Sequence, residues 1–176
     1  QLSGQSITLL HVATHGFYSP LTGHYTAQRS FEEQALSRSG LFLSGAAASL
    51  NMKKIPEDIE DGILTAKELS KLDLSNLNLA ILSACQTGLG EIVGDGVFGL
   101  QRGFKKAGAQ TLLMSLWKVD DTATQLLMAE FYKNLVSGQN KRAAFLNAQK
   151  YLRSYQNGIY DKPEYWAAFI MLDGIH

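Results

Sequence analysis

Residues 77–88, which read LNLAILSACQTG, place the only cysteine of this 176-residue chain, Cys85, after a run of strand-like apolar residues. A second run, ITLLHVATHG at residues 7–16, has the same form and reaches His15. Ligands bind an open parallel sheet at the edge where its strands end. A thiol and an imidazole delivered to that edge could therefore act as a nucleophile and its acid–base partner.

Strand-like and helix-like segments alternate along the rest of the chain. Expected strands cover residues 6–15 (buried on both faces), 41–44, 77–85, 110–117 and 166–172. Four helices are expected. The first begins at the Thr65 capping box and runs to Leu72, and the second covers residues 97–107 and ends at Gly108. The third runs from a cap at Asp120 or Asp121 to Val136, and the fourth covers residues 141–154. Segments 17–40 and 51–62 are expected to be loops or irregular structure. This alternation predicts an α/β fold, a three-layer α/β/α sandwich with a mostly parallel central sheet, as a single domain over residues 1–176.

Composition excludes several classes of protein. Apolar residues make up 45% and charged residues 18% of the chain, as in an ordinary globular protein. The formal net charge is zero and no cluster of Lys and Arg stands out, which argues against nucleic-acid or membrane partners. One cysteine without a disulfide framework fits a reducing compartment, so we expect a cytoplasmic protein. Because the chain starts at Gln1 rather than Met, we expect it to be part of a longer protein.

His15 and Cys85 have two interpretations that the residues alone leave open. In the first, a thiolate at Cys85 attacks a carbonyl with His15 as its partner, and the N–H groups of Gly16 and Cys85 form an oxyanion hole. In the second, Cys85 is a buried core cysteine and His15 bonds a backbone carbonyl at a strand end.

Other site chemistries fit the sequence less well. A tyrosine-phosphatase loop needs an arginine where this chain has Glu91, and the glycines at 88 and 90 lack the third glycine of a dinucleotide loop. His11 and His15 share a strand face but have no third metal ligand. We therefore expect neither a metal nor a cofactor.

Several ordered blocks resemble the CHAT domain family, which belongs to the caspase–separase–gingipain group of cysteine peptidases. The first two blocks are residues 11–16 (HVATHG) and 82–88 (LSACQTG). The others are residues 96–104 (GVFGLQRGF), 107–109 (AGA), 115–121 (SLWKVDD), 131–132 (FY) and 165–169 (YWAAF). The resemblance therefore covers nearly the whole chain.

This resemblance implies a caspase-like fold with a catalytic dyad. His15 would be the general base and acid, Cys85 the nucleophile, and the amides of Gly16 and Cys85 the oxyanion hole. It also implies upstream tetratricopeptide repeats, a protein or peptide substrate, an activating partner and a regulated endopeptidase in bacterial signalling or defence. The alternatives are a non-catalytic CHAT-fold scaffold and a hydrolase or transferase acting on small acyl substrates.

Substrate contacts are expected near the same sheet edge. Related peptidases often hold a basic residue with an acid, for which Asp95, Glu91 and Asp120 are available. Asp120 could instead be a helix cap and Asp95 a turn residue. Trp117 could line the substrate cleft or belong to the core. The segments 17–40 and 51–62 lie where an activation switch could act.

Overall fold

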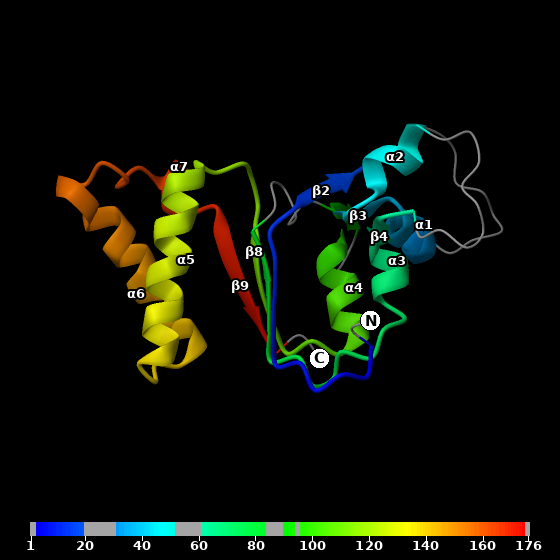
Figure 1. The fold of residues 1–176 in the computed structure, drawn as a ribbon, viewed down its shortest axis with the longest axis horizontal. Coiled ribbons are helices and arrows are strands. Elements are labelled where there is room, and N and C mark those ends of the chain that lie inside the picture. The colour runs from blue at the N-terminus through cyan, green and yellow to red at the C-terminus, as the bar shows by residue number, and fades with distance from the viewer. Residues whose placement is uncertain (1–2, 20–30, 52–60, 84–89, 94–95, 175–176) are drawn as a thin grey trace.

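The computed structural model describes residues 3–19, 31–51, 61–83, 90–93 and 96–174, and shows a mixed α/β fold (Figure 1). Its four-stranded sheet has the order β1-β5-β8-β9, in which β1, β5 and β8 are parallel and β9 is antiparallel to β8. These strands are β1 (Leu9–Val12), β5 (Leu79–Leu82), β8 (Thr111–Ser115) and β9 (Phe169–Asp173). The mostly parallel sheet that the sequence predicts is therefore confirmed.

Two smaller antiparallel sheets and the helices complete the described structure. The smaller sheets are β2-β3-β4 and β6-β7, formed by β2 (His15–Tyr18), β3 (Ser39–Phe42), β4 (Ile63–Thr65), β6 (Gly90–Val93) and β7 (Gly96–Gly99). The helices are α1 (Phe31–Ser37), α2 (Ala46–Asn51), α3 (Ala66–Leu69), α4 (Leu100–Ala107), α5 (Asp121–Val136), α6 (Lys141–Ser154), the 3₁₀ turn η1 (Tyr155–Asn157) and α7 (Pro163–Trp166).

Successive side chains of the central strands enter two different apolar clusters, because a strand points alternate residues to opposite faces. Ala80 and Leu82 belong to the cluster that contains residues of α3 and α4. Leu79 and Ile81 belong to the cluster that contains residues of α5 and α6. Figure 1 shows α5 and α6 on one side of β8 and β9, and α3 and α4 on the other. Since β5 lies between β1 and β8, all four of its residues are buried, which explains its continuous apolar sequence.

Several helix ends follow the chemistry that the sequence predicts, although α3 ends at Leu69 rather than at the expected Leu72. Thr65 and Glu68 form the expected capping box, and Gly108 ends α4 with a positive φ of 96°. Asp120 caps α5, with its carboxylate accepting a hydrogen bond from the amide of Ala123 at 2.9 Å. The helix at residues 141–154 has the expected bounds and is capped by Asn140.

The prediction of one buried strand over residues 6–15 is wrong. β1 ends at Val12, and His15 begins a separate strand, β2, which pairs with β3 in another sheet. The hydroxyl of Thr14 donates to the carbonyl oxygen of Phe42 and so fixes the chain where it passes from one sheet to the next. Among the described strands β1 is an outer strand of its sheet, which is why two of its residues are exposed and the other two only partly buried.

Two further sequence predictions need correction. Gly96–Gly99 is strand β7 rather than the start of a helix, so α4 begins only at Leu100. The segment 17–40 contains the end of β2, helix α1 and the start of β3, whereas residues 20–30 lie outside the described residues. Residues 52–60 of the expected loop at 51–62 also lie outside them.

Candidate functional site

The proposed dyad residues follow the same parallel strand pair at equal distances along the chain. Val12 and Leu82 are the last partners in the β1–β5 register, and the Ser83 amide donates to the Val12 carbonyl at 3.2 Å. His15 comes three residues after Val12, and Cys85 comes three residues after Leu82. Because β1 and β5 are parallel, both chains leave the sheet at the same edge. His15 itself is exposed at the start of β2.

The backbone N–H of Gly16 is directed away from its partner strand β3. Gly16 is paired with Leu41 in the β2–β3 register. One end of the same register continues to Ser19, whose amide donates to the backbone carbonyl of Arg38 at 2.8 Å. Hydrogen-bonded and non-hydrogen-bonded pairs alternate in antiparallel sheets. The pair that contains Ser19 is hydrogen-bonded, so Gly16, three residues earlier in this alternation, is in a non-hydrogen-bonded pair. The N–H of Gly16 therefore points away from β3. β2 is an outer strand of its sheet among the described strands, which leaves this N–H directed outward.

Two of the predicted site residues, Cys85 and Asp95, lie outside the described residues. Glu91 lies in β6 opposite Phe98. The meeting of the Cys85 thiol with His15, and the roles of Asp95 and Glu91, therefore stay predictions.

A small cavity lies where β5 and β8 end. It is lined by Ser83, Ser115, Trp117, Val119, Asp121, Thr124 and Phe169. Its volume of about 30 Å³ is enough for a water molecule. Two of its walls come from Ser83, two residues before Cys85, and from Ser115, the last residue of β8. The cavity therefore lies at the sheet edge where the sequence predicts substrate contacts.

Trp117 lies at the surface of this cavity rather than in the core. Its side chain is 38% exposed, and its indole N–H donates to the carbonyl oxygen of Glu164 at 3.1 Å. That bond joins the ring to α7, and Trp117 is also one of the residues that line the cavity. Asp121, rather than Asp120, contributes the carboxylate of the lining, whereas Asp120 caps α5.

Three polar side chains that sequence reasoning did not assign to the site lie close to it. Nε2 of His11 lies 2.9 Å from Oγ of Ser83, and Nδ1 of His11 lies 2.7 Å from the hydroxyl of Tyr132 on α5. Burial lowers the pKa of His11 and raises that of Tyr132, so both groups favour their neutral forms. Strand parity places His11 and Ser83 on one face, but no local signal in the sequence connects either to Tyr132.

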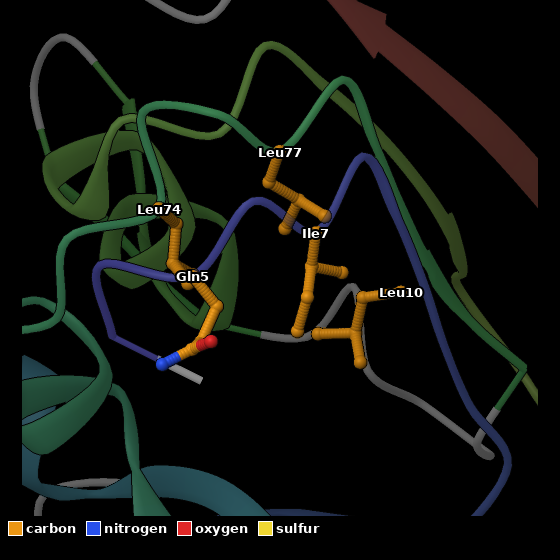
Figure 2. A pocket seen from close by; sticks show the side chains of 5 residues that line it. All are labelled: Gln5, Ile7, Leu10, Leu74 and Leu77. Carbon is orange, nitrogen blue, oxygen red and sulfur yellow. The ribbon is translucent and has the colours of Figure 1, made fainter. Parts of the chain in front are cut away.

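A second small cavity lies at the opposite edge of the sheet (Figure 2). Its lining consists of Gln5 and the aliphatic side chains of Ile7, Leu10, Leu74 and Leu77. These residues are before or at the start of β1 and β5, away from the edge that His15 follows. With a mainly aliphatic lining and no nucleophile or acid, this cavity is part of the packing around the core.

Neither a metal cluster nor a membrane span is present in the part of the chain that the structure describes. Within the described ranges, no group of three or more His, Cys, Asp or Glu side chains could hold a metal ion. The helices that the structure describes are too short or too polar to cross a bilayer.

Sequence comparison identifies the family. Residues 1–174 match the CHAT domain. The chain belongs to the CHAT domain family. This CHAT domain is therefore a member of a caspase-like group, as the resemblance of its sequence blocks implies.

The CHAT domain is also similar to parts of two long mammalian proteins. Tetratricopeptide repeat protein 28 of Mus musculus is 34% identical over 110 residues, which cover 62% of the CHAT domain and 4% of that protein. The protein of the same name from Homo sapiens is 32% identical over 114 residues, covering 65% of the CHAT domain and 4% of that protein. The chain thus spans a small part of the relatives it matches.

Proposed function

We propose that this CHAT domain is a cysteine endopeptidase that uses His15 and Cys85 as its catalytic dyad. The observation that carries the proposal is the common exit of both chains from the β1–β5 pair, three residues after Val12 and Leu82. The outward N–H of Gly16, next to His15, supplies a donor beside the same edge. Membership of a caspase-like family supports peptide-bond hydrolysis as the chemistry.

The reaction begins with proton transfer from the Cys85 thiol to the His15 imidazole. The thiolate attacks the peptide carbonyl carbon, and the amides of Gly16 and Cys85 stabilise the resulting oxyanion. The carbon–nitrogen bond breaks as His15 gives its proton to the leaving amine, which leaves a thioester on Cys85. A water molecule, deprotonated by His15, then attacks the thioester, releases the carboxylic acid and restores the thiol.

The substrate cleft in this proposal extends over the cavity between β5 and β8. Trp117 would contact the substrate with its exposed face, and an acidic side chain at Asp95 or Asp120 would hold a basic residue of the substrate. Asp121 is a further carboxylate at this cavity. The small volume of the cavity requires side chains at its mouth to move before a large substrate residue enters.

The proposal includes the caspase-like three-layer sandwich and a place in a longer, regulated cytoplasmic protein. Support for the layers comes from the two apolar clusters that alternate residues of β5 enter. The name of the two mammalian relatives, tetratricopeptide repeat protein 28, supports an upstream repeat region and an activating partner that acts through it.

An electrophilic peptide probe and a peptide-library cleavage profile, both applied to the intact parent protein, test the proposal. We expect Cys85→Ala and His15→Ala each to reduce cleavage by about a thousandfold or more, because members of a dyad act as a unit. Val136→Ala, a change at a residue that is 89% exposed, serves as a control and should leave cleavage unchanged. Cleavage by either dyad variant at the wild-type rate would refute the assignment. Failure of the probe to label Cys85 in the intact, activated protein would favour a scaffold instead.

A further inference from the structure

The contact between His11 and Ser83 links the two strands that lead to the proposed dyad. His11 is on β1, four residues before His15, and Ser83 follows β5, two residues before Cys85. Their side chains meet at 2.9 Å, and the Ser83 amide also bonds the Val12 carbonyl. The ends of β1 and β5 are thus joined by both a backbone and a side-chain bond.

Tyr132 extends this link to α5. Its hydroxyl lies 2.7 Å from Nδ1 of His11, and the two rings are 5.8 Å apart between centroids. A neutral imidazole has one donor and one acceptor nitrogen, so one hydroxyl donates to the ring and the other accepts from it. His11 is therefore held from both sides, by a strand end and by a helix.

The chemistry of these groups indicates a positioning role. A phenol and a hydroxyl carry no charge at neutral pH, and burial favours the neutral form of His11. The network therefore supplies no charge to stabilise an imidazolium or a thiolate. What it does supply is a fixed geometry for the last residues of β1 and β5.

We propose that His11, Ser83 and Tyr132 form a positioning network that sets Cys85 in reach of His15. This inference rests on the proposed dyad. A small misplacement of reacting groups can reduce a rate by about a hundredfold, so loss of the network should impair the dyad without removing either member. A purely structural role would change stability and leave the reactivity of the thiol unchanged.

Alkylation of Cys85 by iodoacetamide measures this effect directly. The thiolate displaces iodide as the carbon–sulfur bond forms, and peptide mapping of the intact parent protein reports the labelling of Cys85, the single cysteine of this domain. Iodoacetamide is small and needs no peptide cleft, which separates positioning from any effect of Ser83 on the cavity. The quantity to compare is the acceleration that His15 provides, which is the ratio of the labelling rate with His15 to the rate with His15→Ala.

We expect His11→Leu and Ser83→Ala to reduce that acceleration by about tenfold or more. The matched variants His11→Gln and Ser83→Thr keep a hydrogen-bonding group at each position and should restore most of it. Tyr132→Phe removes only the outer bond and should give a smaller reduction. Circular dichroism confirms that each variant is folded, and if Ser83→Ala does not fold, Tyr132→Phe and the two matched variants carry the comparison.

The outcomes separate this inference from the proposed function. Network variants that keep the full acceleration would overturn the inference and leave the dyad intact. Equal reductions in the matched variants and in the removing variants would also overturn it, because the hydrogen bonds would then not be the cause. Equal labelling of wild type and His15→Ala would overturn both proposals.

Discussion

The His11 imidazole and the Ser83 hydroxyl meet at 2.9 Å, although 72 residues separate them in the sequence. His11 lies on β1 and Ser83 directly follows β5, and the chain beyond each strand carries one member of the proposed dyad. The contact therefore couples a titratable group on β1, which also contacts Tyr132 of α5, to the strand end from which Cys85 follows.

The partial desolvation of the His11 imidazole predicts a pH dependence of stability. Desolvation lowers the pKa of His11 in the folded protein below the usual histidine value of about 6.5, so the unfolded chain binds the proton more tightly. The contribution of neutral His11 to the stability of the folded protein is fully present above about pH 6.5. It is lost as the pH falls through the pKa of His11 in the folded protein. Urea unfolding at pH 7.5 and pH 5.5 should show a smaller loss of stability on acidification for His11→Gln than for wild type. Identical losses would contradict this prediction.

Asp120 offers a test that separates a helix cap from a substrate contact. Asp120→Ala should destabilise the protein by about 1 kcal/mol, because the amide of Ala123 loses its acceptor. Asp120→Asn keeps a capping oxygen and should retain nearly full stability in thermal unfolding. If the charge of Asp120 also holds a basic substrate residue, Asp120→Asn will cleave basic substrates more slowly. Unchanged cleavage would restrict Asp120 to its cap.

Trp117 should affect peptide recognition more than thiol reactivity. Trp117→Phe removes the hydrogen bond to Glu164, at a cost of about 1 kcal/mol, and reshapes the cavity wall. We expect a severalfold slower reaction with an electrophilic peptide probe and an unchanged rate with iodoacetamide. Equal reactivity with the peptide probe would remove Trp117 from the cleft.

The apolar cluster beneath α5 should be sensitive to loss of volume. Leu113, on β8, is fully buried in this cluster, so Leu113→Ala should lower the free energy of unfolding by about 2–5 kcal/mol. Leu146→Ala changes the same residue type at a site that is 49% exposed, and should change stability by about 0.5 kcal/mol or less. Urea unfolding of the two variants gives the comparison, and similar values for both would contradict the assigned core.

Features that depend on neighbouring residues could be predicted from the sequence. The capping box at Thr65, the caps at Asp120 and Gly108, and the helix at residues 141–154 all follow from local hydrogen bonding and helical periodicity. The buried strand β5 follows from its unbroken apolar run. Trp117 could likewise be placed near the end of β8 from the pattern alone, whereas the position of His15 and Gly16 in a separate strand could not.

Features that depend on distant residues could not be predicted. The break between β1 and β2 relies on the hydrogen bond from Thr14 to Phe42, and strands β6 and β7 rely on their antiparallel pairing with each other. His11 gave only a doubtful metal pattern, because its real partners lie 72 and 121 residues away.

The sequence by itself determined helices α5 and α6, the caps at Thr65, Asp120 and Gly108, and the buried strand β5, because short-range hydrogen bonds and side-chain periodicity act within a few residues. Only the tertiary structure decided that His15 begins a second sheet and that His11 joins Ser83 to Tyr132. The physical reason is that strand pairing and packing against α5 bring together groups whose positions the local chain leaves free.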